Sequence, residues 1–84
     1  MEWIPEDIIE AIKITAPIKL GKKIRYYRRI KDLTQAQLAH LVGNDRQYIY
    51  KIEKGKVSPT VSTIAILAYA LDVSLSMLFE EIVP

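Results

Sequence analysis

Residues 34–55, TQAQLAHLVGNDRQYIYKIEKG, predict two short helices joined by a tight turn. Thr34 can cap the first helix, because its hydroxyl accepts from the backbone N–H of Gln37 while the Gln37 side chain reaches back to the backbone N–H of Thr34. Gly43 can end that helix, since glycine adopts the left-handed conformation at little cost. Asp45 can cap the second helix two residues later. Helices with so few residues between them cross at a large angle, as in a helix-turn-helix.

The segments on either side of this stretch predict three further helices. Upstream, IKLGKKIRYYRRIKDL (18–33) places apolar residues on one side and basic residues around the rest, which is typical of a basic amphipathic helix. Downstream, Thr60 and Ser74 can cap a helix over 61–71 and a last short helix. The expected core positions are Leu20, Ile24, Tyr27 with Ile30 or Leu33, then Leu38, Ala39, Leu41, Val42, Ile49, Ile52, Val61, Ile64, Leu67, Ala68 and Leu71. The last short helix carries Leu75, Leu78 and Phe79.

Residues 1–17 predict a short extension of this domain. Four isoleucines lie near one stripe of a helix: Ile4, Ile8, Ile9 and Ile12. The density of β-branched residues there leaves a strand open as the alternative, and we expect Pro17 to end the element. The predicted architecture is therefore all-α: a compact five-helix bundle over 18–84 around a central helix-turn-helix, plus a short amino-terminal helical extension.

Composition and charge narrow the classes of function. The chain has no cysteine and one histidine, which excludes disulfides, thiolate metal sites and multi-histidine metal clusters. The longest apolar run, 64–71, is far shorter than the roughly 20 residues that cross a bilayer, and the acidic amino terminus lacks the basic start of a signal peptide. We therefore expect a cytoplasmic protein without a membrane anchor. All twelve Lys and Arg residues lie within 11–56, a cluster that suits phosphate binding. The alternative is a solvated helix face, and only the neighbouring helix-turn-helix pattern favours phosphate binding over it.

Several separated motifs occur in the order typical of one family. The window 35–54 has Ala39 where the two helices meet, Gly43 in the turn, and Ile49 and Ile52 pointing inward. The accompanying motifs are Leu33-Thr34-Gln35, Leu38-Ala39, Ile52-Glu53-Lys54-Gly55, Ser58-Pro59-Thr60 and Ala70-Leu71-Asp72-Val73-Ser74. With them the chain closely resembles the phage repressor and Cro type of helix-turn-helix, often called the Xre family, over most of its length.

This resemblance implies that the second helix of the motif lies in the major groove of DNA. Arg46 can pair with guanine N7 and O6, and Gln47 with adenine N6 and N7. The implied base contacts are Arg46, Gln47, Tyr50 and Lys51. The implied contacts to the DNA backbone are Gln35, Asn44, Tyr48, Lys54 and Lys56. The family also pairs an arginine with a glutamate, and the matching residues here are Arg28 and Glu53.

The helix expected over 61–71 departs from that family. Its outer side usually carries polar residues, whereas here Ala65, Ile66 and Tyr69 occupy those positions, so the helix is apolar nearly all round and needs cover. Either the amino-terminal isoleucine stripe or a second copy of the chain would supply it. We predict a homodimer, built from the last two helices and the amino-terminal extension over 1–17, that places two recognition helices roughly 34 Å apart on an inverted repeat. Its predicted surface comprises Ile66, Tyr69, Leu78, Phe79 and Ile82.

The sequence thus predicts a regulator of transcription that binds specific double-stranded DNA, either a repressor or an autoregulator, without a cofactor or small-molecule ligand. The alternative is a protein-interaction module with secondary DNA binding, such as an antitoxin-like subunit or a transcription-complex adaptor. The apolar Ile66 and Tyr69 and the acidic ends of the chain favour that alternative. Once Asp45 and Glu53 are assigned to capping and structure, no paired carboxylates remain for acid-base catalysis, so we expect no enzymatic activity.

Overall fold

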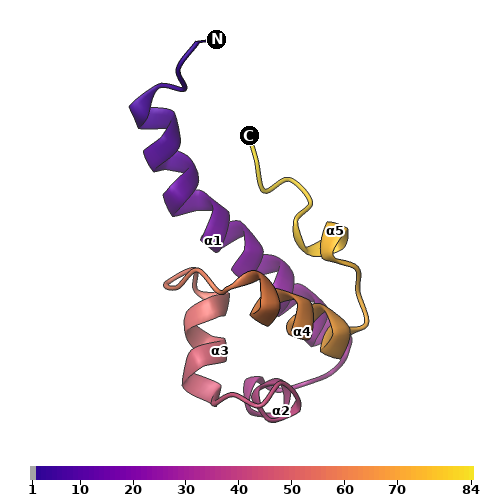
Figure 1. The fold of residues 1–84 in the computed structure, drawn as a ribbon. Helices are drawn as coiled ribbons and strands as arrows, with labels where there is room; N and C mark the ends of the chain where they lie inside the picture. Colours follow the sequence, from indigo (N-terminus) through magenta and orange to yellow (C-terminus); the bar gives the residue numbers. More distant parts are fainter. Residues whose placement is uncertain (1) are drawn as a thin grey trace.

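The computed structural model describes residues 2–84, and these residues form five helices and no strand (Figure 1). The helices are α1 (Glu6–Ile30), α2 (Gln35–Leu41), α3 (Arg46–Glu53), α4 (Val61–Leu71) and α5 (Leu75–Leu78). The predicted all-α, five-helix class is confirmed. Met1, the first residue of the predicted extension, lies outside the described residues. Across the described part of the chain, no helix combines the length and the apolar character needed to cross a membrane.

α1 is one continuous helix of 25 residues, so the break predicted at Pro17 is wrong. A proline inside a helix removes one N–H donor and costs about 3 kcal/mol, but the loss is local. Leu20 and Ile24, one and two turns further on, are 5% and 0% exposed and hold the helix against the core. The predicted extension and the predicted basic helix are therefore two halves of a single element.

Side-chain caps start α2, α3, α4 and α5 where the sequence predicts them. The capping box joins Thr34 and Gln37 through bonds of 3.0 and 2.8 Å. The remaining caps, each accepting from the backbone N–H three residues later, are Asp45, Thr60 and Ser74. After α2, Gly43 has φ 71° and the N–H of Asn44 donates to the carbonyl of Ala39 at 2.9 Å. This Schellman closure fixes the short turn into α3.

The core is formed where α1 meets the other helices. Its largest fully buried side chains are Ile24, Leu38, Ile49, Ile52, Leu67, Leu71 and Leu78. The prediction that Leu78 lies on the dimer surface is therefore wrong. Leu78 is 0% exposed, because α5 packs against both α1 and α4. Leu41, predicted in the core, is 59% exposed, because Leu38 and Ala39 occupy the core-facing side of the short α2.

The first turns of α1 project from the bundle, away from α2 and α3 (Figure 1). Every residue from Glu2 to Ala11 is exposed, and Trp3 is 95% exposed. We call residues 2–11 the arm. Because the arm continues the straight line of α1, its isoleucine stripe does not fold back over α4, which removes one of the two predicted covers for that helix.

Candidate nucleic-acid interface

α3 has an apolar face toward the core and a polar face toward solvent. Ile49 and Ile52 are 0% and 1% exposed. The Asp45 cap fixes the first turn of the helix, and Arg46 and Gln47 are exposed on that turn. Lys51 is exposed one turn later. An α-helix with a capped, accessible first turn has the dimensions and the donors to enter the major groove.

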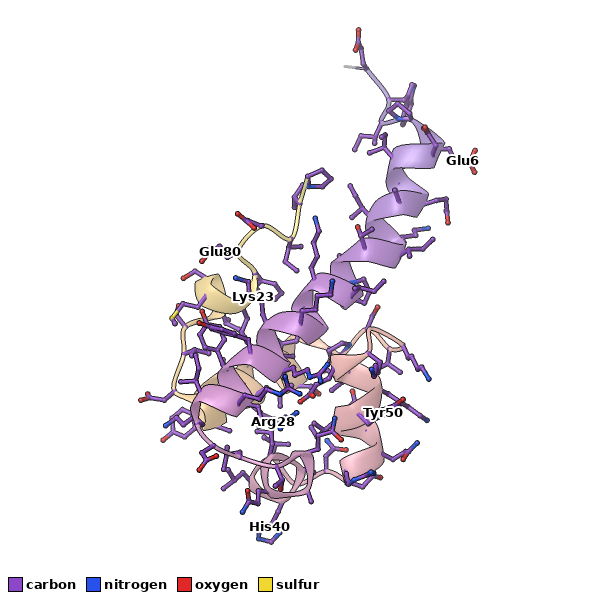
Figure 2. The ribbon with its side chains drawn as sticks, turned by 180° about the vertical axis from the view of Figure 1, so that it is seen from behind. Glu6, Lys23, Arg28, His40, Tyr50 and Glu80 are labelled. Atoms are coloured by element: carbon purple, nitrogen blue, oxygen red, sulfur yellow. The ribbon has the colours of Figure 1, made fainter. Side chains whose placement is uncertain are left out.

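The predicted ion pair between Arg28 and Glu53 is present and fixes α3 to α1. Nε and Nη2 of Arg28 donate to Oε2 and Oε1 of Glu53 at 2.6 and 2.9 Å, and Nη1 donates to the carbonyl of Leu33 at 2.8 Å. Figure 2 shows Arg28 in the space between α1, α2 and α3. The hydrogen bond to Glu53 raises the pKa of Arg28, burial opposes that rise, and the charge of Glu53 adds to it. Arg28 therefore loses its positive charge only at pH values above this raised pKa.

Gln35 takes part in the same arrangement. Its side-chain Nε2 donates to Oε1 of Glu53 at 3.2 Å, so one amide hydrogen of this predicted phosphate contact is already used. The backbone N–H of Gln35 lies in the first turn of α2, where backbone donors have no partner within the helix. For contact with a phosphate, the backbone donor is therefore better placed than the side chain.

Tyr50 lies on α3 (Figure 2), and the side chains of two predicted backbone contacts lie beside its ring. The Nζ atoms of Lys54 and Lys56 lie 5.9 and 5.4 Å from the centre of the Tyr50 ring. Both distances are within the range of cation–π contacts. The structure therefore brings one predicted base contact and two predicted phosphate contacts into a single basic cluster at the end of α3.

The other predicted contact residues differ in accessibility. Asn44 is exposed in the turn between α2 and α3. Tyr48 is half-buried and packs against the core, so only part of its side chain is available. On the predicted dimer surface, Tyr69 and Ile66 of α4 are 90% and 50% exposed. Phe79 is 40% exposed after α5, and Ile82 is half-buried.

Two glycines, Gly21 and Gly55, allow α1 to lie in close contact with α3 and with the turn after α3. Neither glycine contact is predicted from the sequence. A Cβ atom at Gly21 would overlap the carbonyl oxygen of Ile52 and lie 2.7 Å from that of Glu53. A Cβ atom at Gly55 would lie 2.6 Å from Cγ1 of Ile18. A lone glycine within a helical pattern is a sign of such close approach, so Gly21 could have been identified from the sequence.

The crossed α2 and α3, with the first turn of α3 exposed, define a helix-turn-helix protein of the phage repressor type. Residues 24–78 match the HTH_3 (helix-turn-helix) family. The chain belongs to that family, which confirms the resemblance drawn from its motifs.

Known relatives place this chain among regulators of transcription. It is 42% identical to control protein C.SmaI of Serratia marcescens over 62 residues, 74% of each chain. It is 34% identical to the immunity repressor of Bacillus phage phi105 over 62 residues, 74% of this chain but 43% of the repressor. The solved restriction-modification controller protein C.AhdI from Aeromonas hydrophila superposes with a TM-score of 0.72 and 38% identity, over 75% of this chain and 96% of that one. The protein is a DNA-binding transcriptional regulator, as predicted.

Proposed function

We propose that this protein binds an inverted repeat in double-stranded DNA as a homodimer and represses transcription, including that of its own gene. The observation that carries the proposal is the exposed, capped first turn of α3, which is held on α1 by the buried Arg28–Glu53 ion pair. The similarity to a control protein and to an immunity repressor supports repression as the outcome. The proposal requires no cofactor and no catalytic step.

The side chains of α3 divide between two tasks. Arg46 and Gln47, at the amino-terminal end, contact base edges, each contributing about 1 to 3 kcal/mol of discrimination. Lys51 and Tyr50 lie further along the same helix. The residues assigned to the DNA backbone, which position the protein without selecting a sequence, are Gln35, Asn44, Tyr48, Lys54 and Lys56. The cluster of Tyr50 with Lys54 and Lys56 supports a phosphate contact for Tyr50 over a base contact.

Dimer formation places a second α3 on the same face of the duplex. A twofold axis would set the two recognition helices roughly 34 Å apart, so that each enters the major groove one turn from the other. The exposed Ile66 and Tyr69, with Phe79 and Ile82, supply apolar surface for a partner. Two modules double the number of base contacts and therefore the specificity.

Selection of bound duplexes from a random pool tests the proposal directly. We expect enrichment of one sequence in two inverted half-sites. A promoter overlapping that sequence should be silenced when the protein is present. A pool that remains random after repeated selection, with binding that does not depend on Arg46 or Gln47, would contradict the proposal.

The division between base and backbone contacts predicts different results for two substitutions on α3 and at its end. Gln47→Ala should change the preferred base at one position of each half-site, with a loss of about 1 to 3 kcal/mol on the original site. Lys54→Ala should weaken binding to every duplex alike and lower the salt dependence by about one unit per protomer. Fluorescence anisotropy on matched and mismatched duplexes over a range of salt concentrations measures both quantities. Equal losses from both variants on all duplexes would show that the division is wrong.

A second candidate function is that of a protein-interaction module with secondary DNA binding, and Tyr69 favours it. This aromatic side chain is 90% exposed next to the half-exposed Ile66. If the protein is an interaction module, Tyr69→Ser should abolish promoter silencing while dimerisation and selective DNA binding remain unchanged. If it is the proposed regulator, Arg46→Ala and Gln47→Ala should abolish promoter silencing.

A further inference from the structure

The arm, which includes the first turns of α1 over residues 6–11, has little support from the rest of its own chain. α1 begins at Glu6, and its N-cap residue, Pro5, provides no side-chain cap. Within residues 2–84, Glu10 is the one arm carboxylate in an ion pair, a 3.6 Å contact with Lys13 between two exposed side chains. Isoleucine is not a strong helix former, and helices as short as the arm are marginal in water unless an apolar face is packed. The arm therefore requires a surface to pack against.

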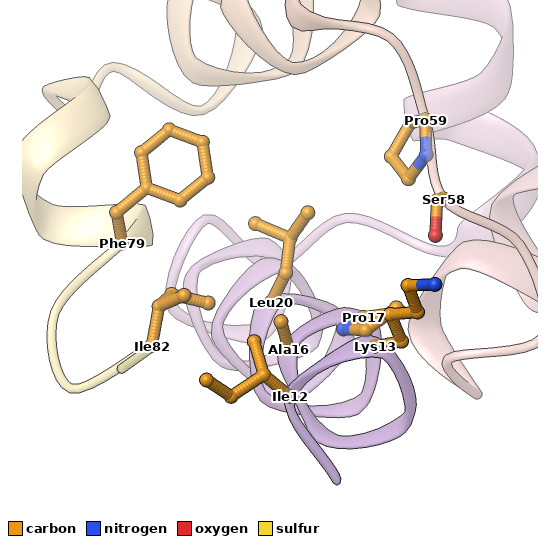
Figure 3. Close-up of a pocket in the computed structure, with 9 residues that line it drawn as sticks. All are labelled: Ile12, Lys13, Ala16, Pro17, Leu20, Ser58, Pro59, Phe79 and Ile82. Carbon is orange, nitrogen blue, oxygen red and sulfur yellow. The ribbon is translucent and has the colours of Figure 1, made fainter. Parts of the chain in front are cut away.

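A groove with apolar walls opens where the arm leaves the bundle (Figure 3). Its volume is about 490 Å³. Figure 3 shows side chains of α1 on its floor, Pro59 on one side and the residues after α5 on the other. The apolar side chains that line it are Ile12, Ala16, Pro17, Leu20, Pro59, Phe79 and Ile82.

The apolar stripe of the arm runs directly into this groove. Ile8, Ile12 and Ala16 are spaced by four residues and share one side of α1, with Ile9 beside them. The arm cannot fill the groove of its own chain, because the arm and the groove floor are parts of one continuous helix. An arm that occupies the groove must come from another copy of the chain.

The charges of α1 determine the direction in which two copies fit. The arm carries Glu2, Glu6, Asp7 and Glu10 and no base, whereas α1 from Lys13 onward carries only basic charges. Lys13 lines the groove, and a second hollow further along α1 is lined by Lys19, Lys22 and Lys23 together with Glu80 and Glu81. Antiparallel α1 helices place each acidic arm beside a basic half, whereas parallel helices place like charges together.

We propose that the arm of each protomer inserts into the groove of a second copy, so that two antiparallel α1 helices pair around a twofold axis. The contact is self-complementary, because each chain supplies one arm and one groove. It rests on the proposed function in one respect, since it adds the arm and the groove to the contacts of the homodimer proposed there. It also assigns a role to a segment that lies outside the residues matched to the family.

Two charge-introducing substitutions in the first half of α1 test the contact. Ile9→Glu places a carboxylate on the apolar stripe, whereas Ile14→Glu makes the same change at a site that is 63% exposed and lies roughly 160° around the helix from Ile12. Sedimentation equilibrium without DNA should give a dimer dissociation constant at least about 100-fold higher for Ile9→Glu, because two buried isoleucines are lost per dimer. Ile14→Glu should stay within about threefold of the wild type. Equal effects of both, or a wild-type monomer at about 100 µM, would overturn the proposal.

Cross-linking between copies provides a second test. Because the sequence contains no cysteine, only the introduced cysteines can form a disulfide. Chains carrying Ile8→Cys are mixed with chains carrying Phe79→Cys and oxidised. We expect a disulfide-linked mixed dimer in higher yield than from Ile14→Cys mixed with Phe79→Cys. Equal yields from the two mixtures would contradict insertion of the arm into the groove.

Failure of this contact and failure of the proposed function give different results. If site selection enriches an inverted repeat while Ile9→Glu dimerises like the wild type, the DNA-binding proposal stands and the arm contact is wrong. If Ile9→Glu is monomeric while no sequence is enriched, the arm contact stands and the proposed regulator is wrong.

Discussion

The two halves of α1 have the same backbone conformation and opposite surroundings. Every buried residue of this helix lies in the second half: Leu20, Gly21, Ile24 and Arg28. The arm, which contributes residues 6–11 to the first half, has no buried or half-buried residue. The second half is therefore held in place by contacts within the bundle, whereas the apolar side of the arm is exposed and available to a partner.

This difference separates folding from assembly within one element. Contacts of α1 with α3 position the recognition helix, so changes in the second half should affect the stability of each protomer. Changes in the arm should leave the protomer intact and act on association. The predictions below test that separation, beginning with the half that the bundle holds.

Removal of the Arg28 side chain should have the largest effect. Arg28→Ala leaves the buried Glu53 without its partner and should lower the free energy of unfolding by about 3 to 5 kcal/mol. Urea denaturation followed by circular dichroism measures this loss. Should the variant be unfolded at 25 °C, Arg28→Lys keeps the charge, loses the two-point contact and gives a smaller, measurable loss.

Arg29→Ala is the matched control, because Arg29 is the next residue and is exposed. Its effect should remain within about 0.5 kcal/mol. Similar losses from Arg28→Ala and Arg29→Ala would mean that helix propensity or general charge, and not the buried ion pair, holds α1 to α3.

Gly21→Ala tests the close approach between the same two helices. Alanine favours a helix over glycine by about 1 kcal/mol, so an unpacked site would be stabilised. Here the added Cβ meets the backbone carbonyls of Ile52 and Glu53, which cannot move independently of α3. We expect a net loss of about 1 to 3 kcal/mol of unfolding free energy, measured by the same denaturation. A gain in stability would show that α1 and α3 have room to separate.

Interactions between residues close together in the sequence predict much of this fold. The predictions that are wrong share one physical cause. The caps at Thr34, Asp45, Thr60 and Ser74 are correct, because each depends on residues at most three apart. The end predicted at Pro17 is wrong, since packing further along the helix outweighs one missing hydrogen bond. Long-range packing, which no local pattern contains, decides such cases.

The same difference between local and long-range contacts applies to the predictions for the candidate interface. The pair formed by Arg28 and Glu53 is predicted through the family motif, although 25 residues separate its members. The engagement of Gln35 with Glu53 is not predicted, because it depends on how α2 crosses α3. The predicted place of Leu78 on the dimer surface is wrong because periodicity shows that a residue is apolar but not which neighbour covers it.

Ala11→Gly should have the smallest effect on the protomer, although it weakens a helix at its interior. Glycine costs about 1 kcal/mol relative to alanine within a helix, and Ala11 is exposed in the arm. If the arm unfolds independently of the bundle, this cost falls on the arm alone. The free energy of unfolding, measured at concentrations where the protein is monomeric, should change by less than about 0.5 kcal/mol. Amide hydrogen exchange should accelerate in residues 6–16 and remain unchanged from Leu20 onward. A full loss of about 1 kcal/mol, with exchange accelerated along all of α1, would mean that the helix is one cooperative unit and that Pro17 does not divide it.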